Sequence, residues 1–360
     1  MRHFLLLLVL ITCMSCVETY KRPKIVTEVV IEPILEDSLL SVRAIDFNDA
    51  YIFYGSADHI GKIGLNPEYK IDLHDVAFKK NKHHYKHILT YKDQPLNFRA
   101  IKQVDGVFFA ISIENPARLY KVPRKSIEPQ LVYEEKNEKV FYDAMNFWNP
   151  KEGIAIGDPT DRCMSIIITR DGGDTWTKLP CEVLPEAQEG EAAFAASNTN
   201  IAIVGNQTWV ATGGKASRIL YSPDKGKTWS VFETPIIQGE NTTGIYSLDF
   251  YNETNGFAIG GDYTKPADAF ANKIKTSDGG KTWQITAQGE TPGYRSSVQY
   301  IPNRNGDELL AVGFKGIDYS ADGGVSWNHL SDEGFFTMTF VNDSIAYAGG
   351  QGRISKLILK

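Results

Sequence analysis

One eight-residue motif occurs four times in the second half of the chain, and it constrains the fold more than any other feature. Its pattern is Ser or Thr, any residue, Asp, any residue, Gly, any residue, Ser or Thr, then Trp. The four copies occupy residues 169–176, 222–229, 276–283 and 320–327, and their aspartates are 53, 54 and 44 residues apart. A motif that recurs at this period indicates a repeat architecture.

Each copy predicts a β-hairpin turn. An aspartate in such a turn accepts hydrogen bonds from the backbone of its own turn, and glycine adopts the positive φ that a tight turn needs. The tryptophan begins the next strand and offers a large apolar face for burial. We therefore assign these residues to the scaffold and no catalysis to them: Asp171, Trp176, Asp224, Trp229, Asp278, Trp283, Asp322 and Trp327.

The four motifs resemble the Asp-box, or BNR repeat, of sialidase-like β-propellers. The composition agrees with a single large all-β domain, because the 360 residues include 31 Gly and are 42% hydrophobic and 11% aromatic. The formal charge of −6 gives no reason to expect nucleic acid as a partner. No apolar run inside the chain reaches the ~20 residues of a membrane span.

The first residues read as an export signal. A short basic start is followed by the apolar run 4–11 and then by two cysteines, Cys13 and Cys16. We interpret 1–15 as a lipoprotein-type signal peptide with Cys16 as the lipidated residue, and 16–23 as a tether. Cys13 competes for lipidation, and an ordinary signal peptide with incidental cysteines is the alternative. Either reading of a lipoprotein signal predicts a lipid-anchored protein of the bacterial cell envelope, in the periplasm or the outer membrane.

Two further cysteines, Cys163 and Cys181, flank the first motif almost symmetrically. Export permits a disulfide between them, although two free buried thiols fit as well. Their spacing is not that of a metal site, and we expect no metal.

A recurring opening phrase divides the rest of the chain into modules of four strands. It predicts seven candidate inner strands, and the seven modules start near residues 41, 97, 141, 191, 245, 295 and 335. The prediction is an all-β, seven-bladed propeller over 24–360. The last module lacks a fourth strand, which 24–35 supplies, closing the ring and removing its exposed edges. Six blades with an irregular start is the alternative.

Charged and aromatic side chains fall on one rim of this predicted propeller. Aligned inner strands place Arg43, Arg99, Asp143 and Tyr246 at one position, with Glu191 and Arg295 beside it, and second strands add Asp158 and Asp262. The phrases around them add Tyr263 and Tyr294. Such a rim suits a polar or anionic partner, although the same carboxylates could cap turns and pair with the arginines.

The order of inner strand, Gly-ended second strand and Asp-Gly-Gly hairpin resembles the photosystem II stability and assembly factor family, within the broader WD40/YVTN-like propellers. In that family an arginine patch on inner strands is thought to contact a partner protein, which implies Arg43, Arg99 and Arg295 here. The acidic residues of the middle modules and the leader depart from the family, so the photosystem role itself does not transfer.

These observations favour a protein- or glycan-binding assembly platform that meets the membrane only through its lipid anchor. The alternative is a carbohydrate-active hydrolase or lyase that uses Asp143, Glu191, Asp158 or Asp262 as paired carboxylates. No motif specific to an enzyme class is present, and sialidases carry an early Arg-Ile-Pro motif that this chain lacks. No dinucleotide, haem or flavin motif is present either, so we expect no cofactor.

Overall fold

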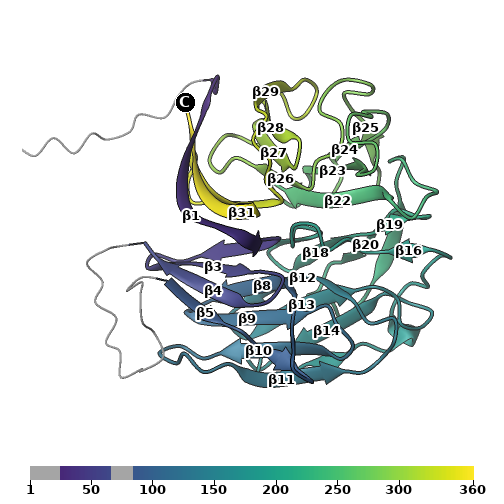
Figure 1. Ribbon diagram of the computed structural model, residues 1–360. Helices are drawn as coiled ribbons and strands as arrows, with labels where there is room; N and C mark the ends of the chain where they lie inside the picture. Colours follow the sequence, from purple (N-terminus) through teal and green to yellow (C-terminus); the bar gives the residue numbers. More distant parts are fainter. Residues whose placement is uncertain (1–24, 66–83) are drawn as a thin grey trace, which may run out of the picture.

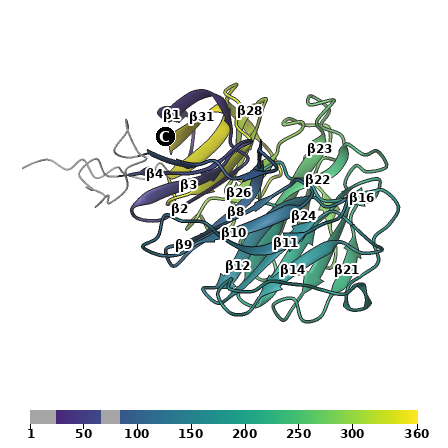
Figure 2. The ribbon, with the colours of Figure 1, turned by 60° about the horizontal axis from the view of Figure 1, so that its bottom comes forward.

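A computed structural model describes residues 25–65 and 84–360 as seven β-sheets arranged in a ring (Figure 1 and Figure 2). The predicted signal peptide, tether and Cys16 lie outside the described residues. The described chain is built from strands, apart from the three-residue 3₁₀ turn η1 (Cys181–Val183), and none of it forms a helix long and apolar enough to cross a membrane. The predicted seven-bladed, all-β propeller is confirmed.

The first four blades each hold four antiparallel strands. Blade 1 contains β2 (Ala44–Phe47), β3 (Tyr51–Gly55), β4 (Ile60–Gly64) and β5 (His84–His87). Blade 2 contains β8 (Phe98–Val104), β9 (Val107–Ser112), β10 (Ala117–Val122) and β11 (Gln130–Glu135). Blade 3 contains β12 (Tyr142–Asn149), β13 (Glu152–Gly157), β14 (Ser165–Thr169) and β15 (Thr177–Lys178). Blade 4 contains β17 (Ile201–Val204), β18 (Gln207–Ala211), β20 (Arg218–Ser222) and β21 (Ser230–Glu233).

The remaining blades vary this plan. Blade 5 contains β22 (Thr243–Phe250), β23 (Gly256–Asp262), β24 (Lys273–Thr276) and β25 (Gln284–Ile285), and the short strands β16 (Glu191–Ala192) and β19 (Gly213–Gly214) extend its sheet. Blade 6 contains β26 (Ser297–Tyr300), β27 (Leu309–Gly313), β28 (Gly316–Ser320) and β29 (Asn328–Ser331). Blade 7 contains β30 (Thr337–Phe340), β31 (Ile345–Leu359) and β1 (Val29–Ser41). A separate hairpin joins β6 (Thr90–Tyr91) and β7 (Gln94–Pro95).

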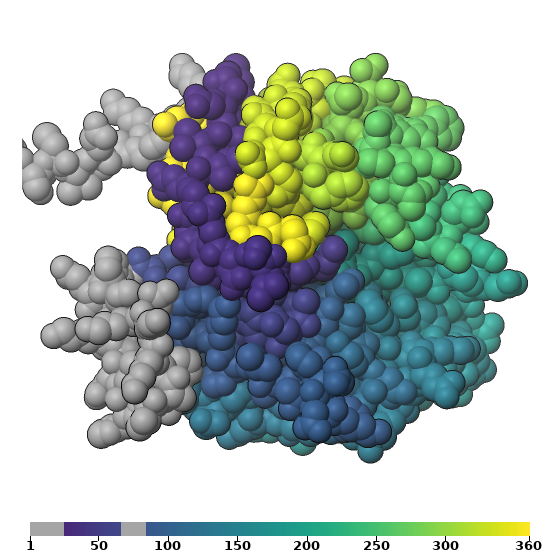
Figure 3. Space-filling model, in the orientation of Figure 1, coloured from purple at the N-terminus to yellow at the C-terminus, as the bar shows by residue number. Residues whose placement is uncertain are grey.

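The N-terminal strand closes the ring, as predicted. β1 pairs antiparallel with β31, from Val29 opposite Leu359 to Ser41 opposite Gln351. It is the third and outermost strand of the last sheet, not a fourth, and it begins and ends later than the predicted 24–35. Figure 3 shows the first described residues, in purple, lying against the yellow C-terminal residues. The first strands of the seven blades contact one another in order around the ring, β30 and β2 included.

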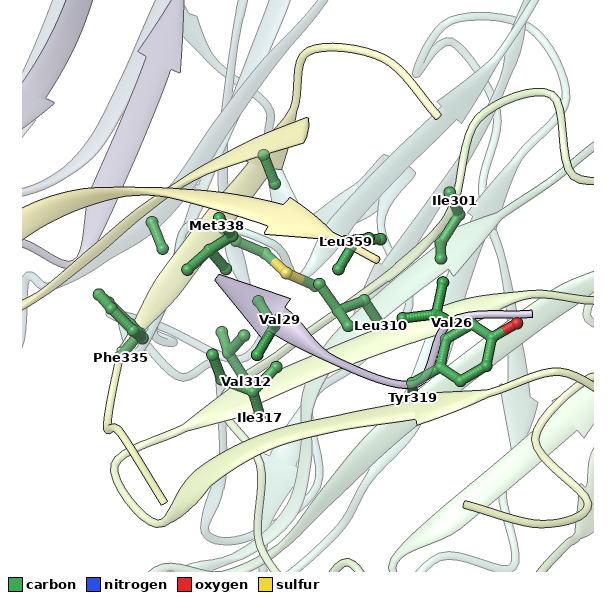
Figure 4. Packing of buried hydrophobic residues seen from close by; sticks show 13 residues of the cluster. Val26, Val29, Ile301, Leu310, Val312, Ile317, Tyr319, Phe335, Met338 and Leu359 are labelled. Atoms are coloured by element: carbon green, nitrogen blue, oxygen red, sulfur yellow. The ribbon is translucent and has the colours of Figure 1, made fainter. Parts of the chain in front are cut away.

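Apolar side chains fill the space between neighbouring blades. The largest cluster lies between blades 6 and 7, where Leu310 and Ile317 pack against Val29 and Leu359 (Figure 4). Each of the other six junctions between blades has its own buried cluster. Burial of apolar area at about 25 cal/mol per Å² makes these junctions the main source of stability.

The four repeated motifs form the predicted turns, which we call the Asp turns (residues 169–176, 222–229, 276–283 and 320–327). In the third, Asp278 Oδ1 accepts hydrogen bonds from the Thr276 hydroxyl at 2.8 Å and the Thr282 amide at 3.0 Å, and Oδ2 accepts one from the Thr282 hydroxyl at 2.7 Å. Gly279 and Gly280 have φ of +79° and +82°. The other three turns repeat the pattern.

Each Asp turn also joins its blade to the preceding one. Trp176 of blade 3 packs edge-on against Phe109 of blade 2, with ring centroids 6.3 Å apart. A Cβ on Gly173 would lie 2.2 Å from the same ring, so only glycine permits this contact. The equivalent glycines Gly226, Gly280 and Gly324 likewise meet a side chain of the preceding blade. The turns therefore connect blades 2 to 6 in series.

One predicted inner strand is wrong. Residues 191–197 were expected to open the fourth module, but the innermost strand of blade 4 is β17, ten residues later. Glu191 and Ala192 instead form β16, which pairs with β19 on the sheet of blade 5. The alanines and phenylalanine of this stretch have the composition of a buried strand, yet Ala193–Asn200 makes no strand pairing.

The segment 193–200, which we call the plug, crosses the channel instead. The Asn198 carboxamide accepts a hydrogen bond from the Met145 amide and donates one to the Ile101 carbonyl, both at 2.9 Å. The Thr337 hydroxyl donates to the Ser197 carbonyl at 2.7 Å. The plug is thereby bonded to the inner strands of blades 3, 2 and 7.

Cys163 and Cys181 are joined by a disulfide in blade 3, with Cα atoms 5.5 Å apart. Of the two alternatives open from the sequence, the structure has the bonded one.

Replacing the aspartate of an Asp turn should cost stability without changing the fold. Asp278→Ala removes three hydrogen bonds to a charged acceptor, and a bond of this kind contributes at most about 1.5–3 kcal/mol net. Because two of the three are exposed, water takes over part of them in the variant. We expect a loss of roughly 2 kcal/mol in the free energy of unfolding, measured by urea denaturation. Lys281→Ala, on an exposed residue of the same turn, is the matched control and should change little. An equal effect of both substitutions would contradict the scaffold role.

Candidate functional site

A pocket of about 440 Å³ opens at one mouth of the channel. The starts of the inner strands form its walls, and Ala193–Ala196 of the plug also line it. The plug makes it a blind pocket at that mouth. Of the predicted site residues, the following line it: Arg43, Arg99, Asp158, Tyr246, Tyr263 and Tyr294.

β-bulges direct several of these side chains toward the channel. Arg99, Asp143 and Tyr246 each lie at a break in the pairing of the first and second strands of their blades. A bulge leaves one residue unpaired and re-aims its side chain. Arg43 and Phe336 take the same place directly before β2 and β30. The alignment of inner strands made from the sequence therefore identified a real structural register.

Arg43 and Arg99 carry positive charges that no carboxylate neutralises by direct contact. Among the described residues, neither guanidinium makes a hydrogen bond or an ion pair, and both Nε atoms are buried without a partner. Aromatic rings support them instead: Arg43 lies over Phe336 at 4.1 Å and Arg99 over Phe141 at 5.9 Å from the ring centroid. Burial and then the charge of Arg99 lower the pKa of Arg43 to about 10, and burial lowers the pKa of Arg99.

Two buried arginines at the same end of the propeller, Arg218 and Arg295, are paired instead. Arg218 donates to both carboxylate oxygens of Glu191, at 3.1 and 2.5 Å, and Arg295 donates to Asp318 at 2.5 Å. Glu191 and Arg295 were predicted to bind the ligand, but neither lines the pocket. They form ion pairs that hold the sheets around it, which is the structural alternative left open from the sequence.

Two of the predicted catalytic carboxyl groups, Asp143 and Asp158, lie at or beside the pocket. Asp143 is fully buried, and neither of its oxygens makes a hydrogen bond. Burial and then the negative charge of Asp158 raise its pKa well above the usual range, while the positive charge of Arg99 opposes this. Asp158 is half-buried and accepts a hydrogen bond from the Ala193 amide of the plug at 2.8 Å. Burial raises the pKa of Asp158 to about 6.

The last predicted carboxylate, Asp262, caps a turn. Its Oδ1 accepts hydrogen bonds from the amide and the hydroxyl of Thr264, at 2.9 and 2.7 Å. It does not line the pocket. The four candidate catalytic carboxylates therefore do not converge: only Asp143 and Asp158 influence each other, while Asp262 and Glu191 are engaged elsewhere.

An arc of aromatic rings forms the wall opposite the arginines. Phe194 of the plug stacks on Tyr246 with centroids 4.0 Å apart, and Tyr294 meets Tyr246 edge-on at 4.7 Å. Tyr263 and Phe314 continue the arc and remain 48% and 37% exposed, so they are available to a ligand. Phe141, Phe194, Phe314 and Phe336 were not predicted as site residues. Phe336 shares the register of Arg43, which was the one sequence signal available for them.

No protein-family model and no curated protein matches the chain. Solved structures do match its fold. A structure titled "YCF48 bound to D1 peptide" has a TM-score of 0.62 and 11% identity and covers 94% of this chain and 99% of its own. YCF48 from Cyanidioschyzon merolae has a TM-score of 0.58 and 11% identity, and the match covers 92% of this chain and 99% of its own. The WD40 repeats of RRP9 have a TM-score of 0.61 and 11% identity, and the match covers 92% of this chain and 98% of their own. At these identities the likeness establishes the propeller fold alone.

The raised pKa of Asp158 should appear in the pH dependence of stability. Its carboxyl is protonated in both states below the unfolded pKa of 3.8, so its burial penalty appears only as pH rises from there through about 6. Asp158→Asn keeps an acceptor for the Ala193 amide but cannot ionise. We expect the free energy of unfolding of this variant, measured by urea denaturation, to exceed that of the parent by about 2 kcal/mol at pH 8 and to equal it at pH 4. The same difference at both pH values would contradict the shift.

Proposed function

We propose that this protein is a binding platform for a partner protein, and that the pocket at the channel mouth receives an acidic segment of that partner. The observation that carries the proposal is the unpaired state of Arg43 and Arg99, because the other arginines of the described residues are paired. A guanidinium binds carboxylates through two parallel hydrogen bonds, and its partial burial strengthens that interaction. The aromatic arc offers apolar and planar contact to neighbouring residues of the same segment.

A solved propeller of the same fold supports a peptide as the occupant. The YCF48 structure, with a TM-score of 0.62 to this chain, is titled as bound to the D1 peptide. The fold therefore accommodates a peptide in at least one other protein. We infer the same kind of ligand here from the pocket itself, because the resemblance does not identify the partner.

Binding is favoured over catalysis by the arrangement of the carboxylates. Glycoside hydrolysis requires two carboxyl groups that flank the scissile bond on an open surface. Asp143 has no exposed surface, and Glu191 is held by Arg218. The raised pKa of Asp158 beside Asp143 is the one observation that keeps a glycan-active enzyme as the alternative.

The arginine pair should control binding of acidic peptides. We expect a panel of fluorescent ten-residue peptides to bind more tightly as glutamates are added beside a phenylalanine, measured by anisotropy. Arg43→Ala or Arg99→Ala should weaken binding at least tenfold, because each removes a half-buried, unpaired charge that lines the pocket. Arg162→Ala, on an exposed arginine whose carboxylate partners are also exposed, is the matched control and should leave binding unchanged.

A photo-crosslinking residue at Phe314 then identifies the natural partner in cells, and the crosslinked product should disappear with Arg99→Ala. Equal binding of acidic and neutral peptides would refute the platform. Turnover of any member of a glycan panel that is lost in Asp158→Asn would establish the enzyme alternative instead.

We further propose that the protein is exported and lipid-anchored through Cys16. The apolar leader ahead of Cys16 supports this, and so does the disulfide, because such bonds persist in oxidising compartments. The protein would then present its pocket from the cell envelope to partners at the membrane.

Lipidation can be tested directly. Labelling of expressing bacteria with an alkyne fatty acid should mark the protein, and Cys16→Ser should abolish both the label and the membrane fraction. Cys13→Ser is the matched control and should retain both. If Cys13→Ser abolished the label and Cys16→Ser did not, the lipid would be on Cys13. If both variants kept the label and the membrane fraction, the lipid anchor would be excluded.

A further inference from the structure

A second open site lies between blades 1 and 2, at their outer part. It is a groove of about 940 Å³. Tyr51 and Phe53 of β3 and Lys62 of β4 line one side. Phe108 and residues 123–128 of the β10–β11 connection line the other. It shares no lining residue with the channel pocket.

The groove lies where four of the other six junctions have an Asp turn. At the junctions 2/3, 3/4, 4/5 and 5/6, the turn of the later blade packs against the preceding blade. Blade 2 carries no such motif, so no tryptophan enters from its side. Its inner strand also has Gln103 at the position that holds Phe147 in blade 3 and Phe250 in blade 5. Two bulky aromatic side chains are thus missing, which accounts for the empty volume.

Lys62 lies at this junction, and the equivalent lysine of the next junction shows which contacts a bound turn would make. In blade 2, Lys121 is paired with Phe109, and it donates to the next blade's Asp turn: to the Gly172 carbonyl at 2.9 Å and to the Asp174 carboxylate at 2.6 Å. Lys62 is paired with Phe53 at the same position of blade 1. Within the described residues Lys62 makes no ion pair, and its ammonium lies 4.9 Å from the ring centroids of Tyr51 and Tyr85.

We propose that this groove binds a turn of a partner protein that carries an acidic residue and a tryptophan two positions later, as Asp174 and Trp176 do in the third blade. The carboxylate would pair with Lys62 as Asp174 pairs with Lys121, and the indole would fill the space beside Phe53 and Phe108. Desolvated aromatic anchors of this kind dominate many protein interfaces. The site is independent of the arginine pocket and would give the platform a second contact.

The chain's own turn provides the probe. A cyclic peptide of residues 169–178, with 5-fluorotryptophan at the position of Trp176, is titrated with the full chain and followed by ¹⁹F NMR. We expect saturable binding that Lys62→Met weakens at least fivefold and that Gln103→Trp, which fills the groove, abolishes. Arg43→Ala should leave it unchanged, so this result is separable from the test of the channel pocket.

A double-mutant cycle shows whether Lys62 acts through the acidic residue. The peptide with Asp174→Asn should bind the parent chain less well, yet bind Lys62→Met as well as the unaltered peptide does. Thermal unfolding must show that Gln103→Trp is folded, and Gln103→Phe serves as a second, smaller filling variant. Absence of saturable binding, or equal binding by the filled variants, would overturn the proposal. Binding only after residues 66–83 are replaced by a Gly-Ser linker would also overturn it, because the groove would then be reserved for this chain's own segment.

Discussion

The hydrogen bonds of Asn198 across the channel are the interaction on which the functional end of this propeller depends. Asn198 has a φ of 61°, a left-handed conformation that asparagine tolerates better than most residues. Its carboxamide bridges inner strands of blades 2 and 3, and the neighbouring Thr199 carbonyl accepts a bond from Leu248 of blade 5. A ring of seven blades leaves a central passage, and this segment is what closes it and gives the arginines a pocket with a floor.

The electrostatics of the pocket follow from that closure. The plug covers Arg43 and Arg99 from below, so both are partly removed from water. The nearby carboxyl groups of Asp143 and Asp158 do not act as their counter-ions by direct contact. Asp143 is sealed in and its pKa is raised, while Asp158 is held by the plug through Ala193. Elsewhere on the same rim Glu191 neutralises Arg218 and Asp318 neutralises Arg295. The site is therefore distinguished by which charges lack a partner, since charged side chains occur all around the rim.

Features that depend on local contacts could be predicted from the sequence, whereas features that depend on the closed ring could not. The Asp turns were predictable because the hydrogen bonds of each aspartate lie within eight residues. The inner-strand register was predictable because it recurs from blade to blade. The pairing of Arg218 with Glu191 was not predictable, because the two residues are 27 positions apart and belong to different sheets. The plug was misassigned for a related reason: its small apolar residues fit a buried strand equally well, and only the channel, a product of the whole ring, selects the irregular path. The state of Cys163 and Cys181 stayed open because the proximity of the two segments in the fold, not their spacing in the sequence, decides it.

Because the Asp turns are unevenly distributed, neighbouring blades are connected in different ways around the ring. Blades 2 to 6 are connected by both apolar packing and a turn that reaches the preceding blade. Blade 7 is held differently, by the long pairing of β1 with β31, which ties the first described strand to the last. The junction of blades 1 and 2 has no Asp turn. Besides the apolar cluster around Phe98 and Phe53, the Phe98 amide donates to the Ser56 carbonyl at 2.9 Å and the Gln103 amide donates to Asp46 Oδ2 at 2.8 Å. What distinguishes this junction is a groove that no Asp turn fills, and a partner bound there would leave the arginine pocket untouched, because the two sites share no lining residue.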